Sequence, residues 1–209
     1  MTIPREPLVE EDERCCPLCD CVVPVGSNEC TRCGMPIPSA KKVMHEARKS
    51  RRIQTRRGLP NVRFSYTYMI KSDVKNLPFH LLLDAVHSGT KGMCITRLFP
   101  DIVKRRLAHV DVPVIWLSST ASDDCIRPRD LEKIALVIEK FIETGPSIIL
   151  IDGIDYLITN NSFKPVLRLV QILRDQVSVH GSILLITVPP AAIQDTDLRM
   201  LEKEADHII

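Results

Sequence analysis

A run of four aliphatic residues, 148–151, is the clearest hydrophobic segment of the chain. Gly145-Pro146 precedes it and Asp152-Gly153 follows it, so it is too short for an independent helix, and it is apolar on both faces. This pattern is typical of a central strand in a parallel sheet. Ligands of open α/β sheets collect at the carboxyl ends of the strands, so Asp152 could hold a hydrated Mg²⁺ there. An equally good interpretation is that Asp152 caps the next segment or orders the turn at Gly153.

The pattern after residue 60 alternates between strand-like and helix-like segments, which indicates an α/β domain with a mainly parallel sheet, helices on both faces and right-handed crossovers. We expect Ile115 in the core with residues 148–151 and 183–186, and Trp116 in the core or at an interface. The predicted strands are residues 62–70, 92–96, 112–117, 148–151 and 182–188, with 207–209 as a candidate sixth. The predicted helices are residues 74–87, 100–107, 128–141, 163–179 and 191–204.

Six of the eight cysteines are concentrated near the N-terminus, within residues 15–33. Two Cys-x-x-Cys pairs, Cys16 with Cys19 and Cys30 with Cys33, each place two thiolates on a tight turn, and together they can close a tetrahedral Zn²⁺ site. So short a segment needs a metal to fold. Four thiolate ligands leave no open position for catalysis, so we expect a structural zinc ribbon.

Two further cysteines, Cys15 and Cys21, leave the choice of zinc ligands open. Pro17 follows Cys16 in the usual Cys-Pro-x-Cys manner, and the pair Cys16 and Cys19 then mirrors the second pair, which favours these two ligands. Cys15 or Cys21 in place of one of them is the alternative.

A basic segment follows the cysteines. From Lys41 to Arg57 the chain carries eight basic residues against one acid, Glu46, with no Pro or Gly before Gly58, so we expect a weakly amphipathic linker helix. Beside a zinc ribbon such a run could bind the phosphate backbone of a nucleic acid. No aromatic residue is interleaved to stack on bases, and a solvated linker is the commoner role of such a run.

Composition places the chain among globular proteins. Of its 209 residues 44% are hydrophobic and 26% charged, and the net charge of +2 indicates no particular partner. No apolar run approaches the roughly 20 residues that span a bilayer, and the N-terminus has no signal-peptide core, so we expect a cytoplasmic protein without membrane contact. A reducing compartment favours metal binding over disulfides. The expected organisation is a flexible tail (residues 1–13), a zinc ribbon (14–38), a basic linker helix (39–60) and an α/β domain (61–209).

An aliphatic strand that ends in Asp suggests the Walker-B strand of a nucleotide-hydrolysing domain, but the phosphate loop that should accompany it is missing. Residues 71–78, after the first predicted strand, contain no glycine, and the loop with paired glycines, residues 89–92, precedes a strand instead of a helix. No Gly-x-Ser-x-Gly elbow is present, and Cys94 and Cys125 have no evident His partner. We therefore expect no catalytic residues and no nucleotide cofactor.

Several polar residues fall at the predicted carboxyl ends of strands. Arg97 is the most informative, because its guanidinium could pair with Asp152 or Asp155, or bind an anionic ligand in a bidentate manner; an ion pair is favoured. The others are Thr96, Ser118, Ser119 and Thr187.

The α/β part of the chain is similar to the DUF835 family, known mainly from archaea. The similarity runs in order over roughly residues 63–209 and is carried by residues 92–97 (GMCITR) with Pro100, 114–118 (VIWLS), 128–131 (PRDL) and 150–158 (LIDGIDYLI). That family looks like a relative of the RecA and KaiC ATPases that has lost the phosphate loop. The resemblance implies a RecA-like fold and a regulatory or adaptor role, and it supplies no catalytic residue. Separately, the two Cys-x-x-Cys pairs resemble an archaeal zinc ribbon.

Taken together, these patterns favour a non-catalytic regulatory or adaptor protein in which a zinc ribbon with structural Zn²⁺ is joined to a pseudo-ATPase domain that binds a protein partner, self-associates or senses a ligand. One alternative is a transcriptional regulator that binds nucleic acid through the ribbon and the segment from Lys41 to Arg57. Another is a Mg-dependent nucleotide-binding enzyme with Asp152 as the acid that holds the metal.

Overall fold

The computed structural model describes residues 14–15, 22–23, 27, 29, 32, 52–53, 61–71, 76–120 and 125–209. The chain divides into two compact units, residues 1–46 and residues 47–209. In the first unit, strand β1 (Arg14–Cys15) pairs antiparallel with β2 (Val22–Val23). The predicted zinc ligands Cys16, Cys19, Cys30 and Cys33 lie outside the described residues.

The second unit begins with a short antiparallel pair. Strand β3 (Arg52–Ile53) lies against β4 (Val62–Arg63), with Arg52 opposite Arg63. The sequence predicted a helix through residues 52 and 53, and that prediction is wrong at these two positions because they pair with a strand. The other residues of the predicted linker helix lie outside the described residues.

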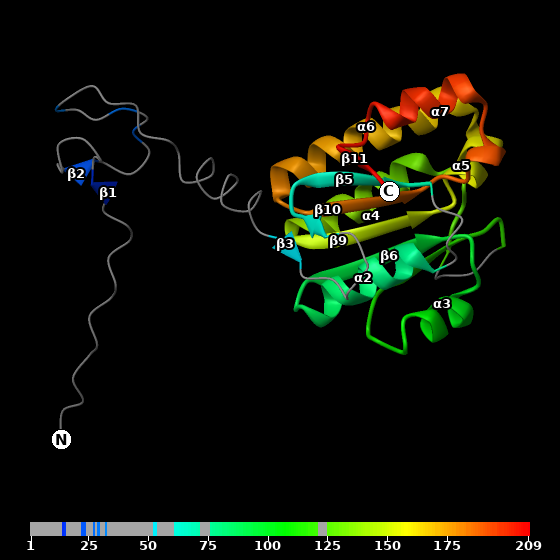
Figure 1. Ribbon diagram of the computed structural model, residues 1–209, viewed down its shortest axis with the longest axis horizontal. Coiled ribbons are helices and arrows are strands. Elements are labelled where there is room, and N and C mark those ends of the chain that lie inside the picture. Colours follow the sequence, from blue (N-terminus) through cyan, green and yellow to red (C-terminus); the bar gives the residue numbers. More distant parts are fainter. Residues whose placement is uncertain are drawn as a thin grey trace. The chain divides into compact units, whose positions relative to one another are not determined.

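The main sheet of the second unit has seven strands in the order β11-β5-β10-β9-β6-β7-β8, and every neighbouring pair is parallel. Figure 1 shows the central strands pointing in one direction. The parallel α/β fold expected from the sequence is therefore confirmed. The strands are β5 (Tyr66–Ile70), β6 (Lys91–Thr96), β7 (Val114–Leu117), β8 (Cys125–Ile126), β9 (Ser147–Asp152), β10 (Ile183–Thr187) and β11 (His207–Ile208).

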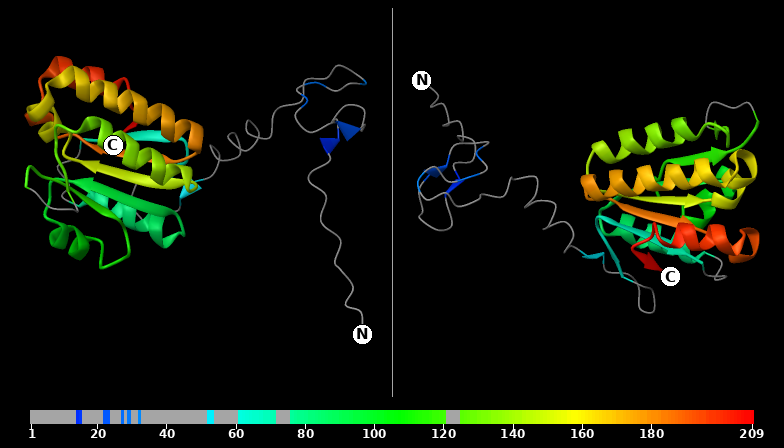
Figure 2. Two further views of the ribbon diagram at one scale, coloured as in Figure 1. Left: turned by 180° about the vertical axis from the view of Figure 1, so that it is seen from behind. Right: turned by 90° about the horizontal axis from the view of Figure 1, so that it is seen from above.

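Helices cover both faces of this sheet, as Figure 2 shows. Ile149 and Ile151 of β9 pack into a core with one group of helices, α4 (Leu131–Glu143), α5 (Ile154–Asn161), α6 (Phe163–His180) and α7 (Asp195–Glu202). Ile148 and Leu150 pack on the other side with α2 (Leu77–His87) and α3 (Pro100–Arg106). No helix within the described ranges is long and apolar enough to cross a membrane.

The structure differs from the predicted elements at four places. Residues 62–70 form two strands because the chain turns at Ser65, whose φ is 69°. Strand β8 and helix α5 were not predicted, since two and eight residues are too few to show a period. The last predicted helix starts later, at Asp195, after a 3₁₀ turn at Pro190–Ala192.

Close packing of α2 on β6 depends on Gly92. A Cβ atom at this position would lie 2.6 Å from Val86 Cγ2 and 3.0 Å from Leu82 Cδ1, which is inside van der Waals contact. The missing side chain therefore lets the helix approach the strand, and it explains why Gly occupies the interior of a buried strand.

We expect Gly92→Ala to lower the free energy of unfolding by about 1–3 kcal/mol, because the added methyl group overpacks the contact between α2 and β6. Urea unfolding followed by circular dichroism measures this change. In a Val86→Ala background the nearest clashing atom is gone, so the same substitution should cost clearly less; equal costs in the two backgrounds would contradict the proposed contact.

Candidate functional site

The strand register brings five residues into one row at the carboxyl edge of the sheet. Ile70, Thr187, Asp152, Thr96 and Trp116 lie side by side on β5, β10, β9, β6 and β7. Four of them are the last residues of their strands. Thr96, Asp152 and Thr187, three of the polar residues predicted at strand ends, are thus neighbours in the structure, with Asp152 at the centre of the row.

The carboxylate of Asp152 is bound from both sides by threonine hydroxyls. Thr96 Oγ1 donates to Oδ2 at 3.0 Å and Thr187 Oγ1 donates to Oδ1 at 2.7 Å. Hydrogen bonds to a charged acceptor are stronger than neutral ones, so the carboxylate joins β6, β9 and β10 at their ends. The alternative interpretation of Asp152 as a helix cap is wrong, because the N-cap of α5 is Gly153 and no side chain caps that helix.

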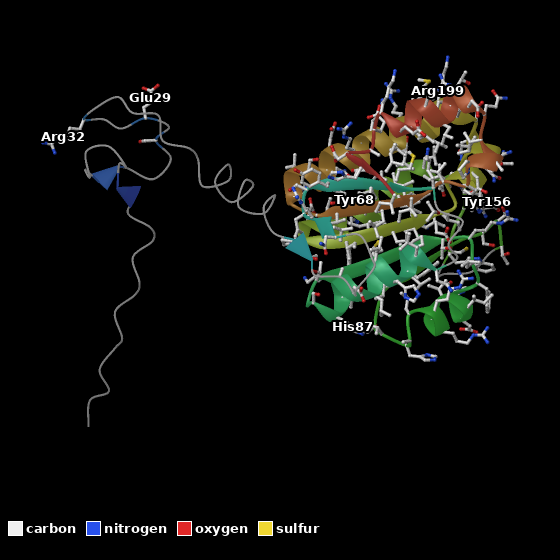
Figure 3. All side chains as sticks on the ribbon, viewed as in Figure 1. Glu29, Arg32, Tyr68, His87, Tyr156 and Arg199 are labelled. Atoms are coloured by element: carbon white, nitrogen blue, oxygen red, sulfur yellow. The ribbon has the colours of Figure 1, made fainter. Side chains whose placement is uncertain are left out.

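Gly153 lets the chain turn directly from β9 into α5. Its φ of 135° is a conformation that residues with a side chain rarely adopt. Because of this sharp turn, Tyr156 in the first turn of α5 lies at the same edge of the domain, as Figure 3 shows.

Arg97, which follows Thr96, lies against an aromatic ring instead of an acid. Its Cζ atom is 4.3 Å from the centroid of the Tyr156 ring, a cation–π contact. Among the described residues no ion pair joins Arg97 to Asp152 or Asp155, so the favoured sequence interpretation is wrong for these partners. The Arg97 side chain is exposed, and its N–H groups can bind an anionic group from solution.

Two further aromatic side chains extend this edge. Trp116 Nε1 donates to the carbonyl oxygen of Arg97 at 3.1 Å, and the ring of Phe99 meets Trp116 edge-on with centroids 5.5 Å apart. Phe99 remains 50% exposed. A guanidinium that rests on one aromatic ring, with an exposed ring at the same edge, can recognise a ligand or peptide that combines a negative charge with a flat or apolar group.

Lys71, directly after β5, and the first turn of α2 are unsuited to holding a phosphate. Lys71, the first residue after β5, has its Nζ atom 2.6 Å from Glu202 Oε1 of α7, in an ion pair. Helix α2 has Pro78 in its first turn, so one backbone N–H donor is missing at its N-terminus. Asn76, at its N-cap, makes no side-chain capping bond.

Cys94 and Cys125, and the strand-end residue Ser118, make contacts that support the structure instead of a reaction. Cys94 is fully buried, and desolvation, followed by the negative charge of Asp152, raises the pKa of its thiol, so the reactive thiolate is suppressed. Ser118 Oγ donates to Thr120 Oγ1, and Cys125 Sγ donates to the Thr120 carbonyl oxygen, which orders the end of β7 against β8. Among the residues that the structure describes, no group of three or more His, Cys, Asp or Glu could hold a metal.

Sequence reasoning assigned no role to Tyr156 and Phe99. Tyr156 follows Asp152 by four residues, a position that a short helix after the strand would have indicated, but that helix was not predicted. Phe99 lies just before Pro100, the first residue of α3. The position of Phe99 in a loop after a predicted strand was the only signal in the sequence for a place at the site. Its exposure is known only from the fold.

We expect Thr187→Val to lower the free energy of unfolding by about 1–2 kcal/mol, because Asp152 loses one of its two hydroxyl donors while its charge remains. Chemical denaturation measures this loss. Thr159→Val is the matched control: its exposed hydroxyl donates to a carbonyl within α5, so its effect should stay within about 0.5 kcal/mol. In an Asp152→Ala background the cost of Thr187→Val should largely vanish, and an undiminished cost would show that the hydroxyl acts elsewhere.

Comparisons with known proteins identify a family and a fold. No curated protein matches the chain. A solved structure from Pyrococcus horikoshii OT3, described as a structural study of Project ID PH0250, is similar with a TM-score of 0.50 and 17% identity, over 70% of this chain and 82% of that one. At this identity the likeness shows the fold alone. Residues 72–205 match the family described as "Protein of unknown function (DUF835)". Because this match spans well over half of the sequence, the chain belongs to the DUF835 family.

Proposed function

We propose that this protein is a non-catalytic regulatory or adaptor protein, with a zinc ribbon joined to a RecA-like α/β domain that binds a partner or senses a ligand without hydrolysing nucleotide. The observation that carries this proposal is the bonding of Asp152. Its two carboxylate oxygens accept hydrogen bonds from Thr96 and Thr187, so the acid that would hold Mg²⁺ in a Walker-B strand serves here to join strands.

The segment that follows β5 supports the same conclusion. A phosphate loop needs glycines that bring backbone N–H groups onto the phosphates and a lysine that reaches their oxygens. Residues 71–78 contain no glycine, and Lys71 is paired with Glu202. Pro78 removes a donor from the first turn of α2. These features support a domain in which the sequence after β5 lacks the glycines of a phosphate loop and the described lysine there is engaged elsewhere.

The pairing of β1 with β2 supports the zinc ribbon. Cys15 lies opposite Val22, so residues 16–21, with Cys16 and Cys19, connect two adjacent antiparallel strands. Two such thiolates with Cys30 and Cys33 form a donor set suited to tetrahedral Zn²⁺. When bound, the metal would supply folding free energy to this small unit.

Recognition is assigned to the exposed side of the carboxyl edge. Arg97 offers its guanidinium there, Tyr156 holds it by a cation–π contact, and Phe99 adds an exposed ring. These three side chains can bind a ligand or a segment of a partner protein, and none of them is a base suited to activating water.

We expect the purified protein to contain one zinc ion per chain and to show no rise in melting temperature with ATP or GTP in the presence of Mg²⁺. A ligand that binds only the folded state raises stability by RT ln(1 + [L]/Kd), so the absence of a shift reports the absence of binding. Elemental analysis and a thermal-shift scan measure the two quantities.

Matched variants test which residues bind zinc and whether Asp152 takes part in nucleotide binding. Cys33→Ser should remove the zinc, whereas Cys94→Ala, which changes a buried cysteine of the α/β domain, should leave it in place. A Mg²⁺-dependent shift that disappears in Asp152→Asn would replace our proposal with the Mg-dependent nucleotide-binding enzyme.

A second candidate function is nucleic-acid binding through the basic segment. The specific observation is the register of β3 and β4, in which Arg52 lies opposite Arg63. The register thus brings a basic position of each strand next to the other, and phosphate backbones bind clustered basic residues. This arrangement adds to the basic run in the sequence from Lys41 to Arg57.

If this candidate is correct, the chain shifts a DNA or RNA fragment in a gel, and the shift weakens as salt rises because binding releases counterions. Replacing Arg51, Arg52, Arg56 and Arg57 together by Ser should then abolish it. The control removes four exposed charges elsewhere, with Lys104, Arg105, Lys133 and Lys140 replaced by Ser. Equal loss in both variants would indicate an effect of net charge alone, and an unchanged shift in the arginine variant would remove this function.

A further inference from the structure

Helices α4 and α6 pack side by side and cover one face of the sheet, as Figures 1 and 2 show. The inner side of α6 is buried through six aliphatic residues, among them Val166, Leu173 and Val177. Its outer side is also patterned. Five exposed residues, here named the α6 stripe, follow one line along the helix: Pro165, Arg168, Ile172, Asp175 and Val179.

The spacing of the α6 stripe is that of a helix that packs on another helix. Its members are separated by three, four, three and four residues, which is the spacing of the a and d positions of a coiled-coil seam. Ile172 is 43% exposed and Val179 is 71% exposed. A helix that has already buried one aliphatic face in its own core has no structural need for a second, so this face is suited to an interaction.

The charges of the α6 stripe indicate which partner fits. The ends of the stripe are symmetric about Ile172, because Pro165 and Val179 lie seven residues to either side. Arg168 and Asp175 lie between these ends, four residues before Ile172 and three after it, so their symmetry is approximate. Neither charge forms an ion pair within the described part of the chain. They are two turns apart, about 10 Å along the axis, and so do not pair with each other.

We propose that the partner is a second copy of this chain, bound through an antiparallel pair of α6 helices with the two-fold axis near Ile172. In this arrangement Arg168 faces Asp175 of the second copy. The two-fold symmetry generates the same pair again, so the interface contains two Arg168–Asp175 ion pairs. Ile172 packs on its own symmetry mate, and Pro165 meets Val179 of the second copy. A two-fold interface has to be self-complementary, and the α6 stripe has that property.

A groove beside the α6 stripe can accommodate Val179 of the second copy, the most exposed apolar residue of the stripe. It has a volume of about 630 Å³, lies between α4 and α6, and is lined by Leu131, Ala135, Pro165, Leu169 and Ile172 among others. Pro165, Arg168 and Ile172 belong to both the stripe and this groove. The antiparallel arrangement therefore brings Val179 of the second copy to the groove, beside Pro165.

This interface is independent of what the carboxyl edge binds, because the α6 stripe includes none of the residues of that site. It gives the protein two copies of each recognition surface. The test below accordingly uses oligomeric state, and its outcome does not depend on zinc content or nucleotide binding.

Sedimentation velocity of the full chain over a range of concentrations should show a reversible monomer–dimer equilibrium. Arg168→Asp and Asp175→Arg should each raise the dissociation constant about tenfold or more, since each places like charges opposite one another twice. Arg105→Asp on α3, which changes the same charge on the other face of the sheet, should leave the constant unchanged. Circular dichroism confirms that these exposed substitutions leave the fold intact.

Mixing Arg168→Asp with Asp175→Arg gives the decisive result. The acid introduced in the first variant then faces the base introduced in the second, and the two unchanged residues of the pair face each other as before. An equimolar mixture should therefore dimerise with a dissociation constant near that of the wild-type chain, about tenfold or more below that of either variant alone. Three outcomes would overturn the proposal: a wild-type chain that stays monomeric at its highest soluble concentration, a dimer insensitive to both substitutions, or variants that fail to combine on mixing.

Discussion

A parallel strand buried on both faces has no side that can meet water, and β9 imposes this constraint on the whole domain. Residues 148–151 are fully buried, and their side chains alternate between two cores. Helices are therefore required on both faces, and the strands on either side must be parallel to allow the crossovers. The strand ends where a charge first occurs, at Asp152, and the polar residues of the carboxyl edge are arranged around that end.

The carboxyl edge separates two kinds of polar group. Asp152 is directed toward its neighbouring strands and is held by Thr96 and Thr187, whereas Arg97 is exposed and rests on Tyr156. The carboxylate joins neighbouring strands, and the guanidinium is left accessible to solvent. Hydrolysis would require the acid to be available to a metal and a phosphate to be held beside it.

The sequence was sufficient to predict the helices and strands whose hydrophobic pattern is contained in one continuous segment. Helix α6 and strands β9 and β10 are long enough to show their own period, and they were predicted within a residue or two. Helix α5 is bounded by Gly153 and Ser162, both with positive φ, and is too short to show a period. Strand β3 exists because β4 pairs with it, and no local propensity reveals such a partner. At the site, position along the chain identified Asp152 and Arg97, but the choice of their partners depended on register and on α5, which only the assembled fold determines.

The place of β5 in the sheet has a consequence for how the protein is made. Its neighbours are β10 and β11, which lie at the far end of the domain sequence, and β11 is held there by bonds between Asp206 and Thr67. On the ribosome, the first strand of the sheet therefore emerges long before either of its neighbours exists. Until then its backbone N–H and C=O groups bind water instead of a neighbouring strand, and its apolar side chains lack their core. Pairing between such distant segments folds slowly, so the nascent chain carries an unpaired strand edge for most of its synthesis.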